Sequence, residues 1–96
     1  MLIYNITVRV EQAIADEWLD WMLRVHIPEV MQTGCFMRYQ LLKLLEQDES
    51  GGPTYVVQYY ASSLEKYQEF LSHRKEFVNI WTDQIVSFRT IMEVLK

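Results

Sequence analysis

Residues 18–30 read WLDWMLRVHIPEV, and residues 33–36 continue the chain as TGCF. Apolar residues recur here at the three- and four-residue spacing of an amphipathic helix: Ile14, Trp18, Trp21, Met22 and Val25. Pro28 disfavours helical geometry at the residue before it, so we expect the helix to break or kink at residues 26–27. A short second helical piece over residues 29–32 can keep the proline in its first turn, and Gly34 suits a left-handed exit. This stretch predicts a helix, a proline break and a glycine turn that lead into a strand.

Around this helix, apolar and polar residues alternate in four segments, which predicts strands at residues 2–10, 36–45, 54–61 and 85–95. The polar and then glycine-rich run 46–53 predicts a hairpin loop. Ser62 and Glu65 have the spacing of a capping box, which predicts a second helix that ends near Trp81. Its apolar residues are Leu64, Tyr67, Phe70, Leu71, Phe77 and Val78.

The expected order is strand, helix, strand, strand, helix, strand. This order predicts an α+β fold of the ferredoxin-like βαββαβ type, a four-stranded antiparallel sheet with two helices on one face. No linker or internal repeat interrupts it, so residues 1–96 should form a single domain.

Composition narrows the classes of function. Half of the 96 residues are hydrophobic, and the formal net charge is −4. Without a basic cluster the chain should bind neither nucleic acid nor an anionic membrane surface. No apolar run approaches the roughly 20 residues that span a bilayer, and the single cysteine suits a reducing compartment. We therefore expect a soluble cytoplasmic protein.

Alternation also sorts the strand residues between two faces of the sheet. If the helices cover the more apolar face, the core contains Tyr4, Ile6, Val8, Met37, Tyr39, Leu41, Tyr55, Val57, Tyr59, Val86 and Phe88, together with Trp18, Trp21, Leu64 and Leu71. The opposite face mixes apolar residues (Ile3, Leu42, Leu44, Val56 and Ile91) with polar ones, chiefly Asn5, Arg38, Gln40, Gln58 and Arg89. Such a face is too apolar to be left in water, so the sequence predicts a homodimer in which these polar residues bond across the interface.

The same residues carry a resemblance to known proteins. The Trp-rich first helix with His26-Ile27-Pro28 and the Gly34 turn resembles the dimeric α/β-barrel superfamily. That superfamily includes ethyl-tert-butyl-ether-degradation-like proteins and antibiotic-biosynthesis monooxygenases. Residues 18–36, 51–55, Gln58-Tyr59 and Phe88-Arg89 more closely resemble a family of small bacterial proteins of unknown function. The resemblance implies a dimeric α/β-barrel fold and no particular activity.

One group of residues is a candidate ligand site between the helices and the sheet: His26, Trp18, Trp21, Tyr39, Tyr55 and Tyr59. Aromatic rings would stack on a planar ligand, and a histidine that titrates near neutral pH would orient it or act as a base. Alternatively, aromatic residues at this spacing simply form part of the hydrophobic core, and the histidine interacts with the C-terminal end of its helix. His26 and His73 lie far apart in the sequence, so neither a metal site nor a cofactor is predicted.

Alternative functions remain open at this point. In one alternative the protein binds a hydrophobic or aromatic small molecule, and cofactor-free oxygenation or ligand sensing would be an extension of that binding. In the other it is a non-catalytic homodimeric structural or interaction protein. No nucleophile–base pair or carboxylate pair is recognisable, so the sequence does not decide whether the protein is an enzyme.

Overall fold

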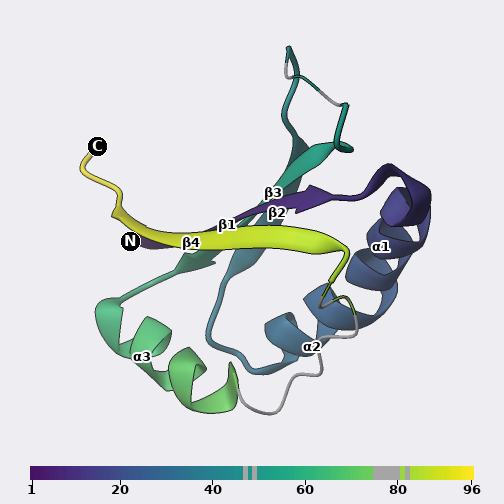
Figure 1. Ribbon diagram of the computed structural model, residues 1–96. Coiled ribbons are helices and arrows are strands. Elements are labelled where there is room, and N and C mark those ends of the chain that lie inside the picture. Colours follow the sequence, from purple (N-terminus) through teal and green to yellow (C-terminus); the bar gives the residue numbers. More distant parts are fainter. Residues whose placement is uncertain (47, 49, 75–80, 82) are drawn as a thin grey trace.

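The computed structural model describes residues 1–46, 48, 50–74, 81 and 83–96. Its strands are β1 (Leu2–Val10), β2 (Arg38–Lys43), β3 (Thr54–Ala61) and β4 (Ile85–Glu93). They form one antiparallel sheet in the order β2-β3-β1-β4, with the helices on one side of it (Figure 1). The predicted α+β, ferredoxin-like arrangement is confirmed. The bounds of β1 and β3 are those predicted, and β2 and β4 are shorter than expected.

The first helical segment is continuous through the proline. A 3₁₀ turn (Gln12–Ile14) leads into α1 (Ala15–Trp21), a π-helical turn (Met22–His26) and α2 (Ile27–Gln32). Of the break or kink expected at residues 26–27, the break does not occur, because Ile27 keeps right-handed helical angles with φ −60° and ψ −45°. The chain absorbs Pro28 by widening the preceding turn, in which the Ile27 N–H donates to the Met22 carbonyl.

The π turn changes which residues face the sheet. Trp18 and Met22 are buried before it, and Ile27 and Val30 are buried after it. Val25, which the 3.6-residue period placed in the apolar stripe, is 41% exposed. The extra residue in the π turn rotates the rest of the helix by about one residue, or roughly 100°. The prediction for Val25 fails for this reason.

Residues beside the helix ends determine where α2 ends and where α3 (Leu64–His73) begins. Gly34 adopts φ +76°, the predicted left-handed exit. The N-cap of α3 is Ser63, whose hydroxyl accepts from the Lys66 N–H at 3.3 Å, so the capping box that was assigned to Ser62 and Glu65 is wrong. The predicted continuation of this helix through Phe77 and Val78 lies outside the described residues.

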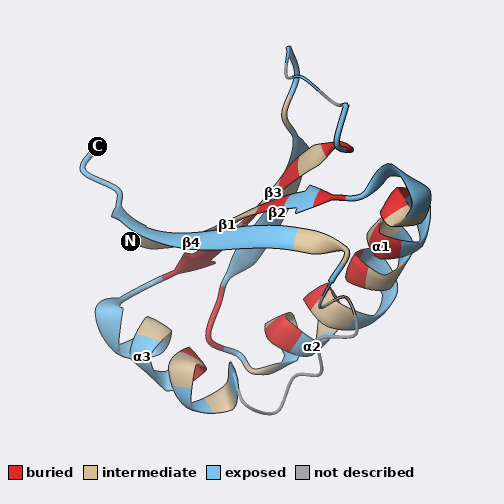
Figure 2. Ribbon diagram, viewed as in Figure 1, coloured by how far each residue is buried: buried red, intermediate tan, exposed pale blue. Residues whose placement is uncertain are grey.

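The core lies between the helices and the centre of the sheet, where β1 and β3 are buried or partly buried along most of their length and the edge strands are almost entirely exposed (Figure 2). The predicted core residues Tyr4, Val8, Tyr55, Val57, Tyr59 and Trp18 are buried, while Ile6, Leu41 and Trp21 pack partly buried against them. Other predicted core residues are exposed instead: Met37, Tyr39, Leu64, Val86 and Phe88. No helix in the described part of the chain is long and apolar enough to cross a membrane.

The sequence pattern assigned the two alternating sets of β4 residues to the wrong faces of the sheet. Pairing with β1 sets Arg89 opposite Ile6 and Phe88 opposite Thr7. Residues directly opposite one another in an antiparallel pair share a face, so Ser87, Arg89 and Ile91 belong to the helix-covered face. Val86 and Phe88 belong to the open face. The apolar half of β4 therefore faces away from the helices.

Candidate functional site

A cavity of about 140 Å³ lies between the helices and the sheet. Its walls come from β1, β3 and β4 on one side and from α1, the π turn, α2 and the end of α3 on the other. The lining residues are Tyr4, Ile6, Val8, Trp18, Trp21, Met22, His26, Val30, Val57, Tyr59, Phe70, Arg74, Ile85, Ser87 and Arg89. The cavity is where the sequence placed a ligand site, beneath the first helix.

Four of the six predicted ligand residues line this cavity: His26, Trp18, Trp21 and Tyr59. Tyr55 lies behind the wall and stacks on Trp18, with ring centroids 5.2 Å apart. Tyr39 is on the edge strand β2, is 42% exposed and is not in the lining. The structure thus gathers four of these residues at one place and leaves two outside it.

Ring stacking fixes the position of His26. The imidazole lies against the Trp21 ring at a centroid distance of 4.9 Å and an interplanar angle of 15°. Trp21 in turn meets Trp81 edge-on at 6.3 Å. Burial lowers the pKa of His26 below 6.5, opposed by the nearby Glu29 and assisted by Arg89. The ring is therefore held neutral near pH 7, with one nitrogen able to accept a proton.

Two polar groups at the cavity wall are buried without a hydrogen-bond partner among the described residues. They are the Trp18 indole N–H and the Tyr59 hydroxyl. Burial raises the pKa of Tyr59, and the neighbouring Tyr4 and Tyr39 raise it further, so this hydroxyl stays protonated. A buried donor that lacks a partner costs about 1–3 kcal/mol. A bound molecule with an acceptor atom could recover part of that cost.

Exposed polar residues mark the mouth of the cavity: Arg74, Ser87 and Arg89. Burial raises the pKa of Tyr4 at the cavity wall, and charge and hydrogen bonding from Arg89, with charge from Arg74, partly oppose that rise. Within the described part of the chain, neither arginine forms an ion pair with a carboxylate. The alternation of apolar residues put Ser87 and Arg89 of β4 on the wrong face of the sheet, and the place of Arg74 depends on how α3 packs, so none of the three was predicted to line the cavity. The register of β4 against β1, had it been known, would have identified Arg89.

The open face carries a polar ladder that is satisfied within one chain. The Gln58 side-chain amide donates to the side-chain oxygen Oδ1 of Asn5 at 3.1 Å. The Tyr60 hydroxyl lies within donating distance of the side-chain oxygens of Gln58, at 3.2 Å, and Gln40, at 3.3 Å. The Arg38 guanidinium lies 3.8 Å from the centre of the Tyr60 ring. Four of the five predicted interface residues thus lie together on this face, and the fifth, Arg89, does not.

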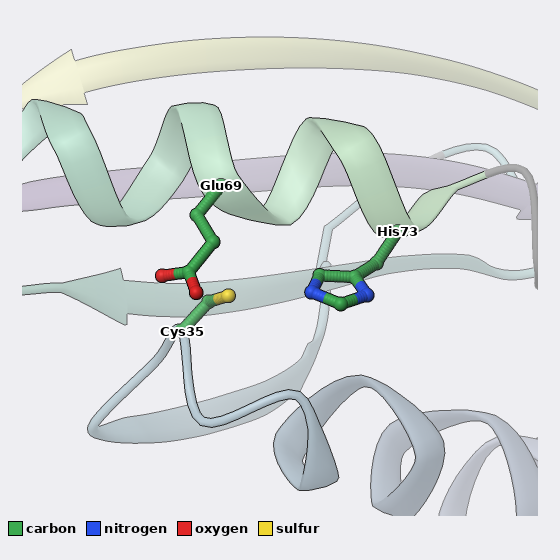
Figure 3. Close-up of side chains that lie close together, drawn as sticks. All are labelled: Cys35, Glu69 and His73. Atoms are coloured by element: carbon green, nitrogen blue, oxygen red, sulfur yellow. The ribbon is translucent and has the colours of Figure 1, made fainter.

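A second cluster lies between α3 and the turn after α2. Cys35, from that turn, comes close to Glu69 and His73 of α3, and one potential metal-binding atom of each lies within 4.8 Å of the others (Figure 3). The four-residue spacing of Glu69 and His73 was visible in the sequence, but the approach of Cys35 was not, because only the packing of α3 against residues 33–36 brings the three together.

Two solved structures show a weak similarity to this chain. One is a PII-like signaling protein from Thermus thermophilus, with 13% identity over 96% of this chain and 87% of that chain and a TM-score of 0.43. The other is the apo form of CPII, a nitrogen regulatory PII-like protein from Thiomonas intermedia, with 11% identity over 98% and 92% of the two chains and the same TM-score. No curated protein matches the sequence.

At such low identity and TM-score, nothing about function transfers from these structures. A family model does match the sequence, over residues 1–95, and it is described as a domain of unknown function, DUF4286. This match spans nearly all of the 96 residues. The expectation of a small family of unknown function with a ferredoxin-like fold is confirmed, and the chain belongs to the DUF4286 family.

Proposed function

We propose that the protein binds a small aromatic acid in the cavity between α1, the π turn and the sheet. The observation that carries the proposal is an aromatic-walled cavity with cationic side chains at its mouth. The ligand's ring would lie among Trp18, Trp21 and Tyr59, and its anionic group would meet Arg89.

The size of the cavity favours a single-ring ligand. Drug-sized molecules occupy pockets of roughly 300–1,000 Å³, whereas an apolar cavity of about 150 Å³ is large enough for one benzene ring. The volume here, about 140 Å³, matches the second case. A larger ligand would require the helices to move.

The polar groups favour a ligand that carries oxygen atoms and a negative charge. Arg74 and Arg89 lie at the mouth, and the Trp18 and Tyr59 donors lie at the wall. Neutral His26 adds a group that can donate or accept. A purely hydrocarbon ligand would leave the buried Trp18 and Tyr59 donors without an acceptor.

Tryptophan fluorescence provides a test, because two of the three tryptophans line the cavity. Benzoate and its neutral analogue benzamide would be titrated into the wild type, Arg89→Gln and Arg38→Gln. Arg38→Gln is the matched control, since it removes the same charge from the open face. We expect benzoate to bind the wild type more tightly than benzamide, and Arg89→Gln to weaken benzoate binding by about tenfold or more.

Arg38→Gln should leave the affinity for benzoate unchanged. Equal weakening in both variants would reduce the effect to overall charge and reject a specific site. Absence of binding to either compound would reject the aromatic acid. Cofactor-free oxygenation, one of the alternatives that the sequence leaves open, would use the same cavity with His26 as base, and oxygen consumption with a bound ligand would test it.

Homodimerisation through the open face is a second proposal, and a specific apolar row supports it. Across this face Leu42, Val56, Thr7 and Phe88 lie side by side on four strands. Phe88 is 61% exposed and the nearby Val86 is 73% exposed. An edge strand with large exposed apolar side chains is a typical place for another chain to cover.

Light scattering after size exclusion tests this proposal. We expect a dimer for the wild type and a monomer for Phe88→Glu, which would bury a charge in the interface. A monomeric wild type at micromolar concentration would reject it.

A further inference from the structure

Side chains of three metal-binding types converge between α3 and the turn that follows α2. Glu69 and His73 are four residues apart on α3 and therefore lie on one face of that helix. Cys35 approaches the same face from the opposite element (Figure 3). The Cys35 sulfur, a Glu69 carboxylate oxygen and a His73 ring nitrogen all lie within 4.8 Å of one another.

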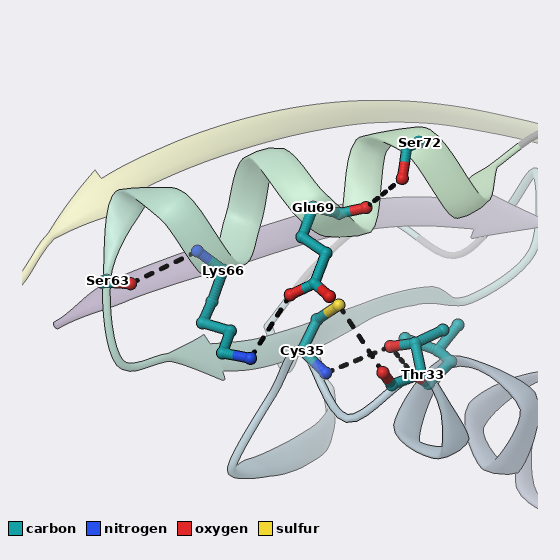
Figure 4. Close-up of polar contacts among 7 residues, drawn as sticks. Thr33, Cys35, Ser63, Lys66, Glu69 and Ser72 are labelled. Carbon is teal, nitrogen blue, oxygen red and sulfur yellow. Dashed lines mark hydrogen bonds and ion pairs between the residues drawn. The ribbon is translucent and has the colours of Figure 1, made fainter.

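Contacts with Thr33 hold Cys35 in place. Its N–H donates to the Thr33 hydroxyl oxygen at 3.2 Å, and that hydroxyl donates to the Val30 carbonyl at 2.7 Å (Figure 4). The Cys35 thiol lies 3.8 Å from the Thr33 carbonyl oxygen, and the residue is only 2% exposed. The sulfur is therefore positioned in advance by the left-handed turn at Gly34.

Glu69 also has a partner that orients it. Lys66 Nζ lies 3.3 Å from one carboxylate oxygen, Oε2, one turn back on the same helix (Figure 4). This contact leaves the other oxygen available to a metal. Carboxylates that bind metals are commonly oriented by a hydrogen bond of this kind from a neighbouring side chain.

The mixture of donors selects the class of metal. Thiolate and imidazole suit zinc and its neighbours among the transition metals, whereas calcium and magnesium require oxygen donors alone. Ligand atoms around a tetrahedral zinc are roughly 3.3–3.6 Å apart. Exposed Glu69 and half-buried His73 can close the remaining distance, about 1 Å, by rotating their side chains.

We propose that Cys35, Glu69 and His73 bind a divalent transition-metal ion of the zinc class, with water as the fourth ligand. The fourth position would face solvent on the side of exposed Glu69. When the metal binds, the Cys35 sulfur loses its proton to solvent and the S–H contact with the Thr33 carbonyl is replaced by a metal–sulfur bond. Affinity should therefore increase as the pH is raised.

Titration with Co²⁺ of the protein purified without metal tests this site directly. A cobalt–thiolate bond gives a charge-transfer absorption band, and Cys35 is the single cysteine in the sequence, so such a band reports on Cys35 alone. We expect one Co²⁺ per chain, a tetrahedral visible spectrum, and loss of both signals when Zn²⁺ is added.

Matched variants separate the three residues from the rest of the chain. Cys35→Ser should abolish the charge-transfer band. Glu69→Gln and His73→Gln should each weaken Co²⁺ binding by about 100-fold or more, beyond the usual effect of changing a residue that only orients a ligand. The controls are Glu65→Gln, which removes another carboxylate from α3, and His26→Gln, which removes the other histidine. Both should bind Co²⁺ like the wild type.

Glu69 and His73 are not fully buried, so their variants should fold even if changes at buried Cys35 disturb the chain. Circular dichroism of each variant checks this. Absence of a thiolate band in the wild type, or unchanged affinity in both Glu69→Gln and His73→Gln, would overturn the proposal.

Discussion

The two faces of the sheet differ in whether their polar groups have hydrogen-bond partners. On the open face, Asn5, Gln58 and Gln40 form a ladder with the Tyr60 hydroxyl, and its members bond to one another. On the helix-covered face, the indole N–H of Trp18 and the hydroxyl of Tyr59 are buried with no partner among the described residues. The buried face is thus the one with unmet hydrogen-bonding capacity.

This contrast indicates where a ligand and where a second chain would fit. On the open face the ladder amides already bond to one another, so they do not call for a ligand. The apolar side chain of Phe88 is exposed on this face. A face with a cavity and unpaired donors gains from a small molecule. The strand β4 contributes to both, with Arg89 on one side and Phe88 on the other.

The largest expected effect comes from deleting a helix side chain that packs against the covered face. Trp18 is 1% exposed and stacks on Tyr55. Trp18→Ala should lower the free energy of unfolding by about 3–5 kcal/mol, because it leaves a large void. Phe88→Ala on the open face should change it by about 0.5 kcal/mol or less. Urea denaturation at low protein concentration measures both. Similar losses in the two variants would remove the distinction between the faces.

An intermediate effect is expected within the polar ladder. Gln58 is bonded to both Asn5 and Tyr60, so Gln58→Ala should lower the free energy of unfolding by about 1–2 kcal/mol. A double-mutant cycle with Asn5→Ala should give a coupling energy of about 0.5–1.5 kcal/mol. Additive losses would mean that the two amides do not stabilise the sheet through their mutual bond.

The smallest expected effect is on the pH dependence of stability. The pKa of His26 is lowered below 6.5 by burial, so between that lowered pKa and 6.5 the unfolded chain binds more protons than the folded chain. The His26 contribution to stability is therefore complete above pH 6.5 and is lost as the pH falls through this interval. The amides of the open face do not titrate and add nothing to it.

Thermal unfolding of the wild type and His26→Gln between pH 8 and pH 5 measures this effect. The wild type should lose more stability than the variant on acidification. A variant that loses equal or greater stability would place His26 in a solvated position.

Sequence periodicity predicted the central strands well and the edges poorly. β1 and β3 have partners on both sides and one buried face, so their alternation reports burial directly. β4 lies at the edge, and its exposed set (Val86, Phe88 and Met92) is more apolar than the set that faces the helices. A rule that sends apolar residues to the core must then choose the wrong face, and with it the wrong face for Arg89.

The candidate sites divide in the same way. His26, Trp18 and Trp21 belong to one helical stretch, and periodicity places them beside the sheet together. Arg74 and the cluster of Cys35, Glu69 and His73 depend on how α3 packs against segments distant in the sequence. Local pattern contains no information about that packing, so these groups could not be predicted.

The π turn at Met22–His26 also bears on how this family can vary in length. A π turn contains one residue more than an α-helical turn. Removing one exposed residue there, such as Leu23 or Arg24, would restore the α-helical turn and still deliver Ile27 and Val30 to the core, but the Pro28 ring would then meet the carbonyl one turn back. A related chain without the extra residue should therefore carry another residue in place of Pro28, and an alignment that permits gaps only in loops would misplace His26 in such a chain.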